Sequence, residues 1–268
     1  MKPRAANFAP LPNVSPRFVR IFTSYTRRHL RSRFHSLRIL RDTLPPRATA
    51  RPLVIYLNHA AWWDPLVCLL LSQQWFADRT SFGPIDAAML ERYGIFKRLG
   101  FYGVEPHSLR GTRNFLRTTR AILASSQNVV WLTPQGRFMD IRERPLRLQP
   151  GLAALAQLAA DAMFVPLAIE YSFWTEPRPE ILVSFGEPIV PRDETPRTSA
   201  EWTQRFTAAL EDTQDELAAR SCRRDPTEWL TLDRGASGVS RIYDAWRRLV
   251  AKVRGEKFSA AHQPEVIR

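Results

Sequence analysis

The residues of this chain whose types and spacing could do chemistry together are a histidine and an aspartate five positions apart, His59 and Asp64. A carboxylate beside an imidazole fixes its tautomer and stabilises the imidazolium, so that the second ring nitrogen can take a proton from an attacking hydroxyl. The pair therefore predicts a general base with the residue that orients it. A purely structural interpretation also fits, in which Asp64 only caps a helix and His59 only makes a hydrogen bond at a strand end.

The elements that must position this pair can be read on either side of it. Residues 53–57 are a short β-branched and apolar run, which predicts a strand ending just before His59. Asp64 is followed by Pro65 and by an apolar segment, residues 66–71, that is long enough to begin a helix. Asp followed by Pro is typical of a helix N-cap and first helical position. In this strand, turn and helix start, both side chains would face one small space.

The sequence Asn58-His59-x4-Asp64-Pro65 after an apolar strand resembles the first motif of the lysophospholipid acyltransferase family, the glycerolipid acyltransferases with a His-x4-Asp signature. The resemblance implies an O-acyltransferase that uses acyl-CoA or acyl-carrier protein as co-substrate, with neither a metal nor a further cofactor. It implies that His59 is the base, that Asp64 holds the imidazolium, and that Asn58 helps to bind substrate. No covalent acyl-enzyme is needed.

A later segment resembles the second motif of the family but departs from it at one position. In the family an Arg usually follows the acidic residue and helps to bind the phosphate of the acceptor, whereas here Pro106 follows Glu105. Arg110 and Arg113 come shortly afterwards, at the start of a helix predicted over residues 111–125, where backbone amides also favour anions. They are candidate substrate-binding residues. A solvated helix start would explain them equally well.

The turn after the strand predicted over residues 128–132 resembles the third motif, which is commonly Pro-Glu-Gly-Thr-Arg. Here Gln135 replaces the Glu, Gly136 keeps its place, Arg137 falls on the usual Thr, and Phe138 on the usual Arg. Gln can still hydrogen-bond but carries no charge, and a displaced Arg need not reach the same phosphate. Gln135, Gly136 and Arg137 are candidate substrate-binding residues, and amides around Gly136 are candidate oxyanion donors. A Pro/Gly loop is the structural alternative.

A fourth resemblance lies in the strand predicted over residues 163–170, where Val165-Pro166-Leu167 is similar to the motif beside the acyl-donor site of the family. It makes Pro166 a candidate substrate-binding residue. Proline within a strand is also typical of a sheet edge or a bulge, so a structural reason is equally available. The next strand, residues 181–189, ends in Gly-Glu-Pro-Ile, which resembles the family as well.

The charge of the chain suits an anionic partner. The formal net charge is +13, which fits nucleic acid, anionic lipid or a phosphate-bearing substrate. Residues 16–40 place apolar residues at near-helical spacing between many arginines. They predict an interfacial helix with Phe18, Phe22, Phe34 and Leu37 in the acyl boundary of a bilayer and the arginines at the headgroups. Packing of this helix on the core is the main alternative. We expect no nucleic-acid partner, because no nucleic-acid-binding module is recognisable.

The order of the predicted elements and the composition indicate how the chain is organised. Strands alternate with helices from residue 53 to 189, which predicts an α/β fold with a mostly parallel central sheet flanked by helices, behind an N-terminal amphipathic helical segment. The expected division is 1–46 (membrane-interface segment), 47–222 (acyltransferase domain) and 223–268 (basic tail with a helix over 242–253). Two cysteines imply no disulfide framework, and no segment is a convincing transmembrane span.

Three functions remain open from the sequence. The first is acylation of a lysophospholipid such as lysophosphatidic acid, on the cytoplasmic side of a membrane to which the protein binds peripherally. The second is the same chemistry on a lipid alcohol without a phosphate, such as a glycosylated or isoprenoid lipid. The third is a non-catalytic protein of the membrane surface with this fold. An intact His59 and Asp64 argue against the third function, and the altered phosphate motifs keep the second open.

Overall fold

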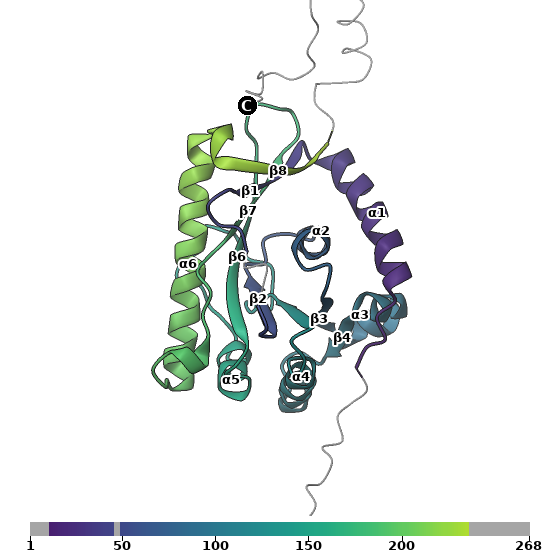
Figure 1. Cartoon of the computed structure of the whole chain (residues 1–268), viewed down its shortest axis with the longest axis vertical. Coiled ribbons are helices and arrows are strands. Elements are labelled where there is room, and N and C mark those ends of the chain that lie inside the picture. The colour runs from purple at the N-terminus through teal and green to yellow at the C-terminus, as the bar shows by residue number, and fades with distance from the viewer. Residues whose placement is uncertain (1–10, 46–48, 236–268) are drawn as a thin grey trace, which may run out of the picture.

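The computed structural model describes residues 11–45 and 49–235, and within them eight strands form one sheet in the order β4-β3-β5-β2-β6-β7-β1-β8 (Figure 1). The strands are β1 (Ser36–Leu40), β2 (Leu53–Leu57), β3 (Thr80–Asp86), β4 (Phe101–Val104), β5 (Asn128–Leu132), β6 (Met163–Ser172), β7 (Glu180–Phe185) and β8 (Trp229–Arg234). The helices are α1 (Pro16–Arg33), α2 (Asp64–Trp75), α3 (Ala87–Arg92), α4 (Leu109–Ile122), α5 (Gly151–Leu158) and α6 (Ser199–Arg223), with short 3-10 turns η1 (Gly94–Leu99), η2 (Pro191–Asp193) and η3 (Pro226–Glu228). Neighbouring strands are parallel except β6 with β7 and β1 with β8, which confirms the predicted α/β fold with a mostly parallel sheet.

Strand β2 is buried on both faces of the sheet. Leu53, Ile55 and Leu57 belong to an apolar cluster with α1 and α2, whereas Val54 and Tyr56 belong to a second cluster with α4, α5 and α6. Figure 1 shows the same division, with α1 and α2 on one side of the sheet and α4, α5 and α6 on the other. A parallel strand covered on both faces is apolar throughout. This is why the sequence of β2 shows no polar alternation.

The central strands bring three loops to one edge of the sheet. Strands β5, β2 and β6 lie side by side and run parallel, so their carboxyl ends open at the same edge. Strand β2 ends at Leu57, β5 at Leu132 and β6 at Ser172, and the three segments that follow them therefore lie at this edge.

The helix predicted over residues 16–40 is shorter than expected. The hydroxyl of Ser15 accepts a hydrogen bond from the Phe18 amide, 3.4 Å away, at the start of α1, and the helix ends at Arg33. Phe34 and Leu37 are both buried, Leu37 within β1 between β7 and β8. The prediction that these two side chains lie in a bilayer is therefore wrong. Since β1 and β8 belong to the sheet, the sheet also extends beyond the boundaries expected at residues 46 and 222.

Helix α1 packs on the core along one side and is exposed along the other. Thr26 and Leu30 are buried, and Arg31 forms an ion pair of 2.5 Å with Asp233 on β8. Ile21 and Tyr25 keep 68% and 55% of their surface exposed. The core-packing alternative is thus correct for one side of the helix, and the other side is exposed. Within the described ranges, no helix has the length and apolarity needed to cross a membrane. The predicted basic helix over 242–253 lies outside the described residues.

Proline 166 lies inside the sheet rather than at an edge, but the pairing shifts by one residue beside it, between Leu167↔Phe185 and Phe164↔Ile189, as the bulge alternative predicts. It pairs with Tyr56 on β2, and its carbonyl accepts a hydrogen bond of 2.9 Å from the amide of Gly186, just past the end of β7. The nitrogen and carbonyl of one strand residue point to the same side. The missing N–H of Pro166 therefore faces Gly186, at the point where the regular pairing of β6 with β7 ends and the register shifts by one residue.

Candidate active site

His59 and Asp64 lie in direct contact at the carboxyl edge of the sheet. The Nδ1 atom of His59 is 2.8 Å from Oδ2 of Asp64. Asp64 is only 1% exposed, whereas the His59 side chain keeps 18% of its surface accessible. The carboxylate is therefore hidden behind an imidazole that solutes can reach.

Asp64 does not act as the helix N-cap that the sequence suggested. It is the first residue of α2, the cap position is Trp63, and no side chain makes a capping hydrogen bond there. Its Oδ2 also accepts the amide of Ala61 at 3.0 Å, and its Oδ1 accepts the hydroxyl of Tyr171 at 2.7 Å. Three donors thus converge on one buried carboxylate.

This arrangement determines the tautomer of His59. Both oxygens of Asp64 act as acceptors, so Nδ1 carries the proton that faces Asp64. The Nε2 atom is then unprotonated and able to accept a proton. The ring of Phe138 lies next to the imidazole, with a centroid separation of 4.2 Å, and shields one side of it from water.

The backbone around His59 is fixed by the turn after β5. The amide of His59 donates to Oε1 of the buried Gln135 at 2.8 Å, and the carbonyl of His59 accepts the amide of Met139 at 2.9 Å. The Gln135 amide also contacts Met139 Sδ at 3.3 Å. Gln135 therefore holds the backbone of His59 in place. Because the Gln135 side chain is uncharged, it can be buried while it accepts the hydrogen bond from the His59 amide.

Asn58 extends the pairing of β2 with β6 by means of its side chain. Its Nδ2 donates to the carbonyl of Ile169 at 3.0 Å, and its Oδ1 accepts the Ile169 amide at 2.9 Å. The side chain is buried and both of its polar atoms are occupied. The structure therefore places Asn58 beside the site as a support for the strand end rather than in an open position.

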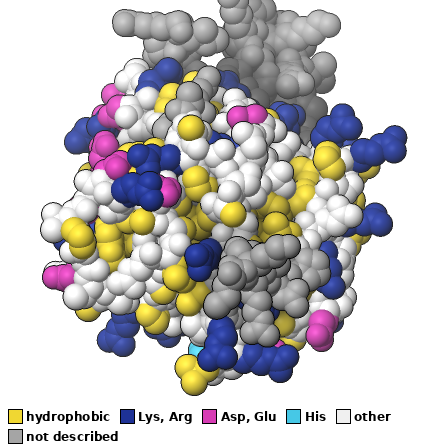
Figure 2. Space-filling model, turned by 60° about the horizontal axis from the view of Figure 1, so that its bottom comes forward, with side chains coloured by type: hydrophobic (Ala, Val, Ile, Leu, Met, Phe, Trp, Pro, Cys, Tyr) yellow, Lys and Arg dark blue, Asp and Glu magenta, His cyan; other side chains and the backbone are white. Residues whose placement is uncertain are grey.

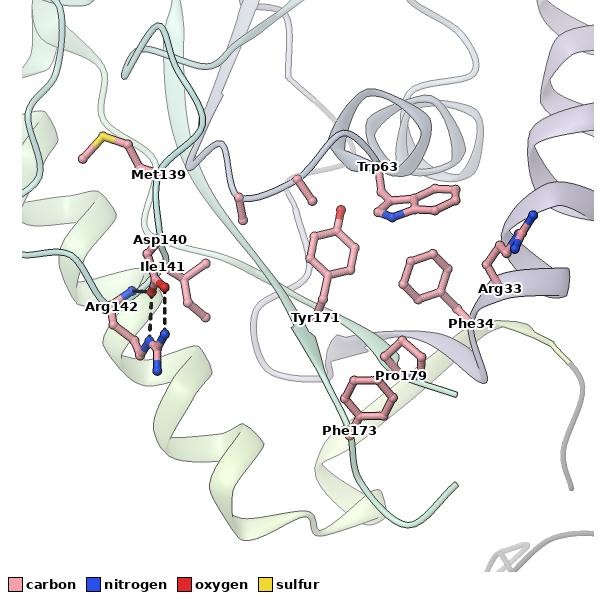
Figure 3. Close-up of a pocket in the computed structure, with 12 residues that line it drawn as sticks. Arg33, Phe34, Trp63, Met139, Asp140, Ile141, Arg142, Tyr171, Phe173 and Pro179 are labelled. Carbon is pink, nitrogen blue, oxygen red and sulfur yellow. Dashed lines mark hydrogen bonds and ion pairs between the residues drawn. The ribbon is translucent and has the colours of Figure 1, made fainter. Parts of the chain in front are cut away.

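A pocket of about 730 Å³ opens beside the pair (Figure 3). Its walls are largely apolar and aromatic and include Phe34, Trp63, Met139, Ile141, Tyr171 and Phe173. In Figure 3 the segment from Asp140 to Arg142 lies across the pocket from Trp63 and Phe34. Arg33 and Arg142 are the cations on the wall. Such a pocket suits an aliphatic chain that carries a polar group at one end.

The other predicted residues of the third motif face solvent. Gly136 adopts a left-handed backbone with φ of +70°, and its amide donates to the carbonyl of Thr133 at 3.0 Å, so this amide is already used within the turn. Arg137 keeps 65% of its side chain exposed and lies 3.8 Å from Glu143. The structure places Arg137 in the right loop, but outside the pocket wall.

Arg110 and Arg113 lie in the first turns of α4 and are exposed. Helix α4 follows β4, and β4 is three strands from β2 in the sheet order, which is about 14 Å at the usual strand spacing. The structure therefore does not bring these two arginines to His59. Pro166 is also apart from the pocket, because it is buried in the middle of β6.

The sequence analysis missed Tyr171, which lines the pocket and bonds to Asp64. Tyr171 alternates along β6 with Leu167 and Ile169, and β6 lies parallel to β2 with Leu167 opposite Leu57. Tyr171 therefore projects just beyond the end of β2, on the face covered by α2. The alternation was visible in the sequence, but the adjacency of β2 and β6 was not.

Comparison with known proteins identifies the family. A protein-family model described as Acyltransferase matches residues 32–170, more than half of the chain, and this stretch contains His59, Asp64 and the third motif. A search of curated proteins finds no match. Among the residues that the structure describes, no three His, Cys, Asp or Glu side chains are grouped as a metal site.

Proposed function

Because the chain belongs to the acyltransferase family and is an acyltransferase, we propose that it moves a fatty acyl group from acyl-CoA or acyl-carrier protein to the hydroxyl of a lysophospholipid such as lysophosphatidic acid. One observation carries the proposal. The buried Asp64 holds the imidazole of His59 at 2.8 Å, with Nε2 free, beside an apolar pocket of about 730 Å³. The third function considered above, a non-catalytic surface protein, is set aside because the family is one of enzymes.

The chemistry requires one proton to move twice. Nε2 of His59 takes the proton of the acceptor hydroxyl while the oxygen attacks the thioester carbonyl, and Asp64 stabilises the imidazolium that results. The C–S bond then breaks, and the departing thiolate receives the proton from the imidazolium. The products are an ester and a free thiol, so atoms and charge balance without a covalent acyl-enzyme.

The acceptor headgroup is the finer part of the proposal. The pocket presents Arg33 and Arg142 to a phosphate, although Arg142 already makes two hydrogen bonds with Asp140 at 2.9 and 2.7 Å. A phosphate on the acceptor could share Arg142 and contact Arg33 at the end of α1. Either contact would be a charge-assisted hydrogen bond of about 1.5–3 kcal/mol.

A second candidate acceptor is a lipid alcohol without a phosphate. The observation in its favour is that the family's phosphate-binding positions are altered here and that the arginines near them do not line the pocket. Arg137 is exposed beside Glu143, and Arg110 and Arg113 lie near the end of β4. An apolar pocket with few unshared cations suits a neutral headgroup as well as an anionic one.

The experiment for the overall function uses the purified full chain, acyl-CoA or acyl-carrier protein with a labelled acyl group, and an extract of membrane lipids. Mass spectrometry of the products should reveal a lipid that has gained the labelled acyl chain, and the His59→Ala protein should form none of it. Absence of any labelled lipid with both donors would contradict acyl transfer to a lipid.

Kinetics with single alanine variants separate the two acceptors. With a phosphate acceptor, Arg33→Ala or Arg142→Ala should raise the KM for the acceptor about 10- to 100-fold. Arg110→Ala and Arg113→Ala are the matched controls and should leave the KM unchanged. If all four variants use lysophosphatidic acid as the parent protein does, the acceptor has no phosphate bound at this pocket.

For the membrane, we propose that the protein binds peripherally to the cytoplasmic face of an anionic bilayer. The outer side of α1 supports this, because Ile21 and Tyr25 are exposed next to Arg17, Arg20 and Arg28. Figure 2 shows basic side chains around much of the outline of one face of the molecule, with hydrophobic side chains exposed between them. Apolar insertion with charge attraction is sufficient for reversible binding.

A further inference from the structure

We propose that Tyr171 is a positioning residue that holds the Asp64 carboxylate in the orientation in which it bonds to His59. This role rests on the proposed function of His59 and Asp64 and adds a third member to the pair. Tyr171 reaches the reacting atoms only through Asp64, so it orients the base instead of exchanging a proton with substrate.

The two oxygens of Asp64 are supported from different elements. Oδ2 accepts from His59 Nδ1 and from the Ala61 amide, both within the turn that precedes α2. Oδ1 is held by the hydroxyl of Tyr171 at 2.7 Å, from the end of β6. Without that hydroxyl the carboxylate is anchored on one side only and can rotate about its terminal bond. The imidazole would keep its partner on Oδ2, but in a less fixed geometry.

Burial prevents water from replacing the tyrosine. Asp64 is 1% exposed, and the ring of Phe34 packs on Tyr171 with a centroid separation of 5.6 Å. A buried acceptor that loses its donor bears the full desolvation penalty. The hydroxyl of Tyr171 is therefore needed at this position. Its removal would leave Oδ1 of Asp64 without a hydrogen-bond donor.

Tyr171 is itself held rigidly and stays protonated. Its backbone pairs with Ile181 in the antiparallel ladder of β6 and β7, so the ring is carried by a strand and not by a loop. Burial raises the pKa of Tyr171 above its usual value, and the neighbouring Asp64 carboxylate raises it further. The phenol is thus a hydrogen-bond donor at every pH at which the enzyme would work.

Removal of the Tyr171 hydroxyl should shift the pH at which the His59 imidazolium releases its proton, and the direction of this shift can be measured. With one donor fewer, more negative charge stays on the oxygen that faces the imidazole, so the imidazolium is stabilised and releases its proton at higher pH. The acid limb of the kcat/KM profile should move with it. The titratable and charged groups around the pair, none of which the Tyr171→Phe substitution alters, are Cys68 on α2, His29 on α1, and Arg33, Asp140 and Arg142 at the pocket.

The test compares Tyr171→Phe with Tyr102→Phe in the full chain. Tyr102 is a matched control, because its hydroxyl is also buried and bonded at 2.7 Å, to Thr119 on α4, away from His59. Tyr171→Phe keeps the ring in the pocket wall, so kcat should fall roughly tenfold with little change in KM. Tyr102→Phe should lower the Tm but leave kcat and its pH profile unchanged.

Two further readouts separate positioning from loss of stability. NMR titration of the His59 ring, which needs no substrate, should show a higher midpoint in Tyr171→Phe than in the parent or in Tyr102→Phe. In the Asp64→Asn protein, adding Tyr171→Phe should change kcat far less than it does in the parent. Identical His59 midpoints, or additive losses in kcat, would overturn the role of Tyr171. Turnover by His59→Ala would instead remove the proposed catalytic pair, and the titration would still report on Tyr171.

Discussion

At the scale of single residues, the contact between His59 and Asp64 leads to the first prediction. His59→Ala should abolish acyl transfer, and Asp64→Asn should lower kcat by about 10⁴, the loss that follows removal of the orienting carboxylate in serine proteases. Binding of the acceptor should change far less, because neither residue forms the wall of the pocket. Steady-state kinetics and circular dichroism of the variants check this. A folded His59→Ala protein with near-normal turnover would exclude His59 as the base.

Asn58 leads to a second residue-scale prediction, in which stability changes more than chemistry. Asn58→Ala leaves the amide and the carbonyl of Ile169 without their partner in a buried place, and each such group costs about 1–3 kcal/mol. We expect a loss of about 2–4 kcal/mol in the free energy of unfolding, measured by urea denaturation. Asn128→Ala is the control, because it removes one half-buried bond to the Ile122 carbonyl. An equal loss in both variants would contradict the role given to Asn58.

The sequence predicted some residues of the site and missed others for a definite reason. His59 and Asp64 could be paired from the sequence because a single turn joins them. Tyr171 could not, because its contact with Asp64 depends on β6 lying beside β2, and that order is a property of the whole sheet. The arginines of α4 show the opposite case. They are close in sequence to a recognised motif, but the strand before them, β4, is separated from β2 by β3 and β5.

At the scale of elements, the strands predicted over 53–57, 128–132 and 163–170 and the helix predicted over 111–125 lie within a few residues of their observed limits. The boundary at Arg33 was missed, because the apolar residues of β1 continue the spacing of α1 by chance and are buried by strands from far along the chain. Strand β8 was missed for the same reason, since Trp229–Arg234 becomes a strand only through its pairing with β1. Local pattern cannot reveal partners that lie so far away.

Helix α1 gives the element-scale prediction. Ile21→Asp combined with Tyr25→Asp should weaken binding to anionic liposomes about tenfold or more, because both side chains are exposed and each loses an apolar contact with the membrane. Co-sedimentation of the full chain with anionic and zwitterionic vesicles, at low and high salt, measures the effect. Leu158→Asp is the matched control, since Leu158 is an exposed apolar residue at the end of α5. Equal loss in both proteins would show that α1 is not the specific contact.

At the scale of the whole molecule, part of the pH dependence of stability can be assigned to Glu170. Burial raises the pKa of Glu170, which the hydroxyl of Ser221 on α6 only partly offsets. A carboxyl whose pKa is raised in the folded state favours folding when protonated. Its stabilising contribution is complete below the unfolded pKa and disappears as the pH rises through the folded one. The contribution of Glu170 to stability should therefore be lost as the pH rises from about 4 towards neutrality.

Glu170→Gln tests this assignment. The amide oxygen can still accept from Ser221, but no charge is buried, so the Tm of the variant should exceed that of the parent at pH 7 and match it near pH 4. Thermal melts across this range measure the difference. Glu91→Gln, on the exposed surface of α3, controls for the loss of one negative charge from a chain of net charge +13. A Tm difference that does not depend on pH would contradict the assignment.

Strand β1 has a consequence for how the protein is made. It leaves the ribosome before every other strand, yet it pairs with β7 and β8, which are synthesised last among the described strands. Ser36 is bonded to Glu180, 144 positions later, and Arg31 to Asp233, 202 positions later. The block from β2 to β6 can pair as it emerges, while the apolar residues of β1 stay exposed on the nascent chain. During translation, this first strand is therefore a natural site for a chaperone to bind and for misassembly to begin.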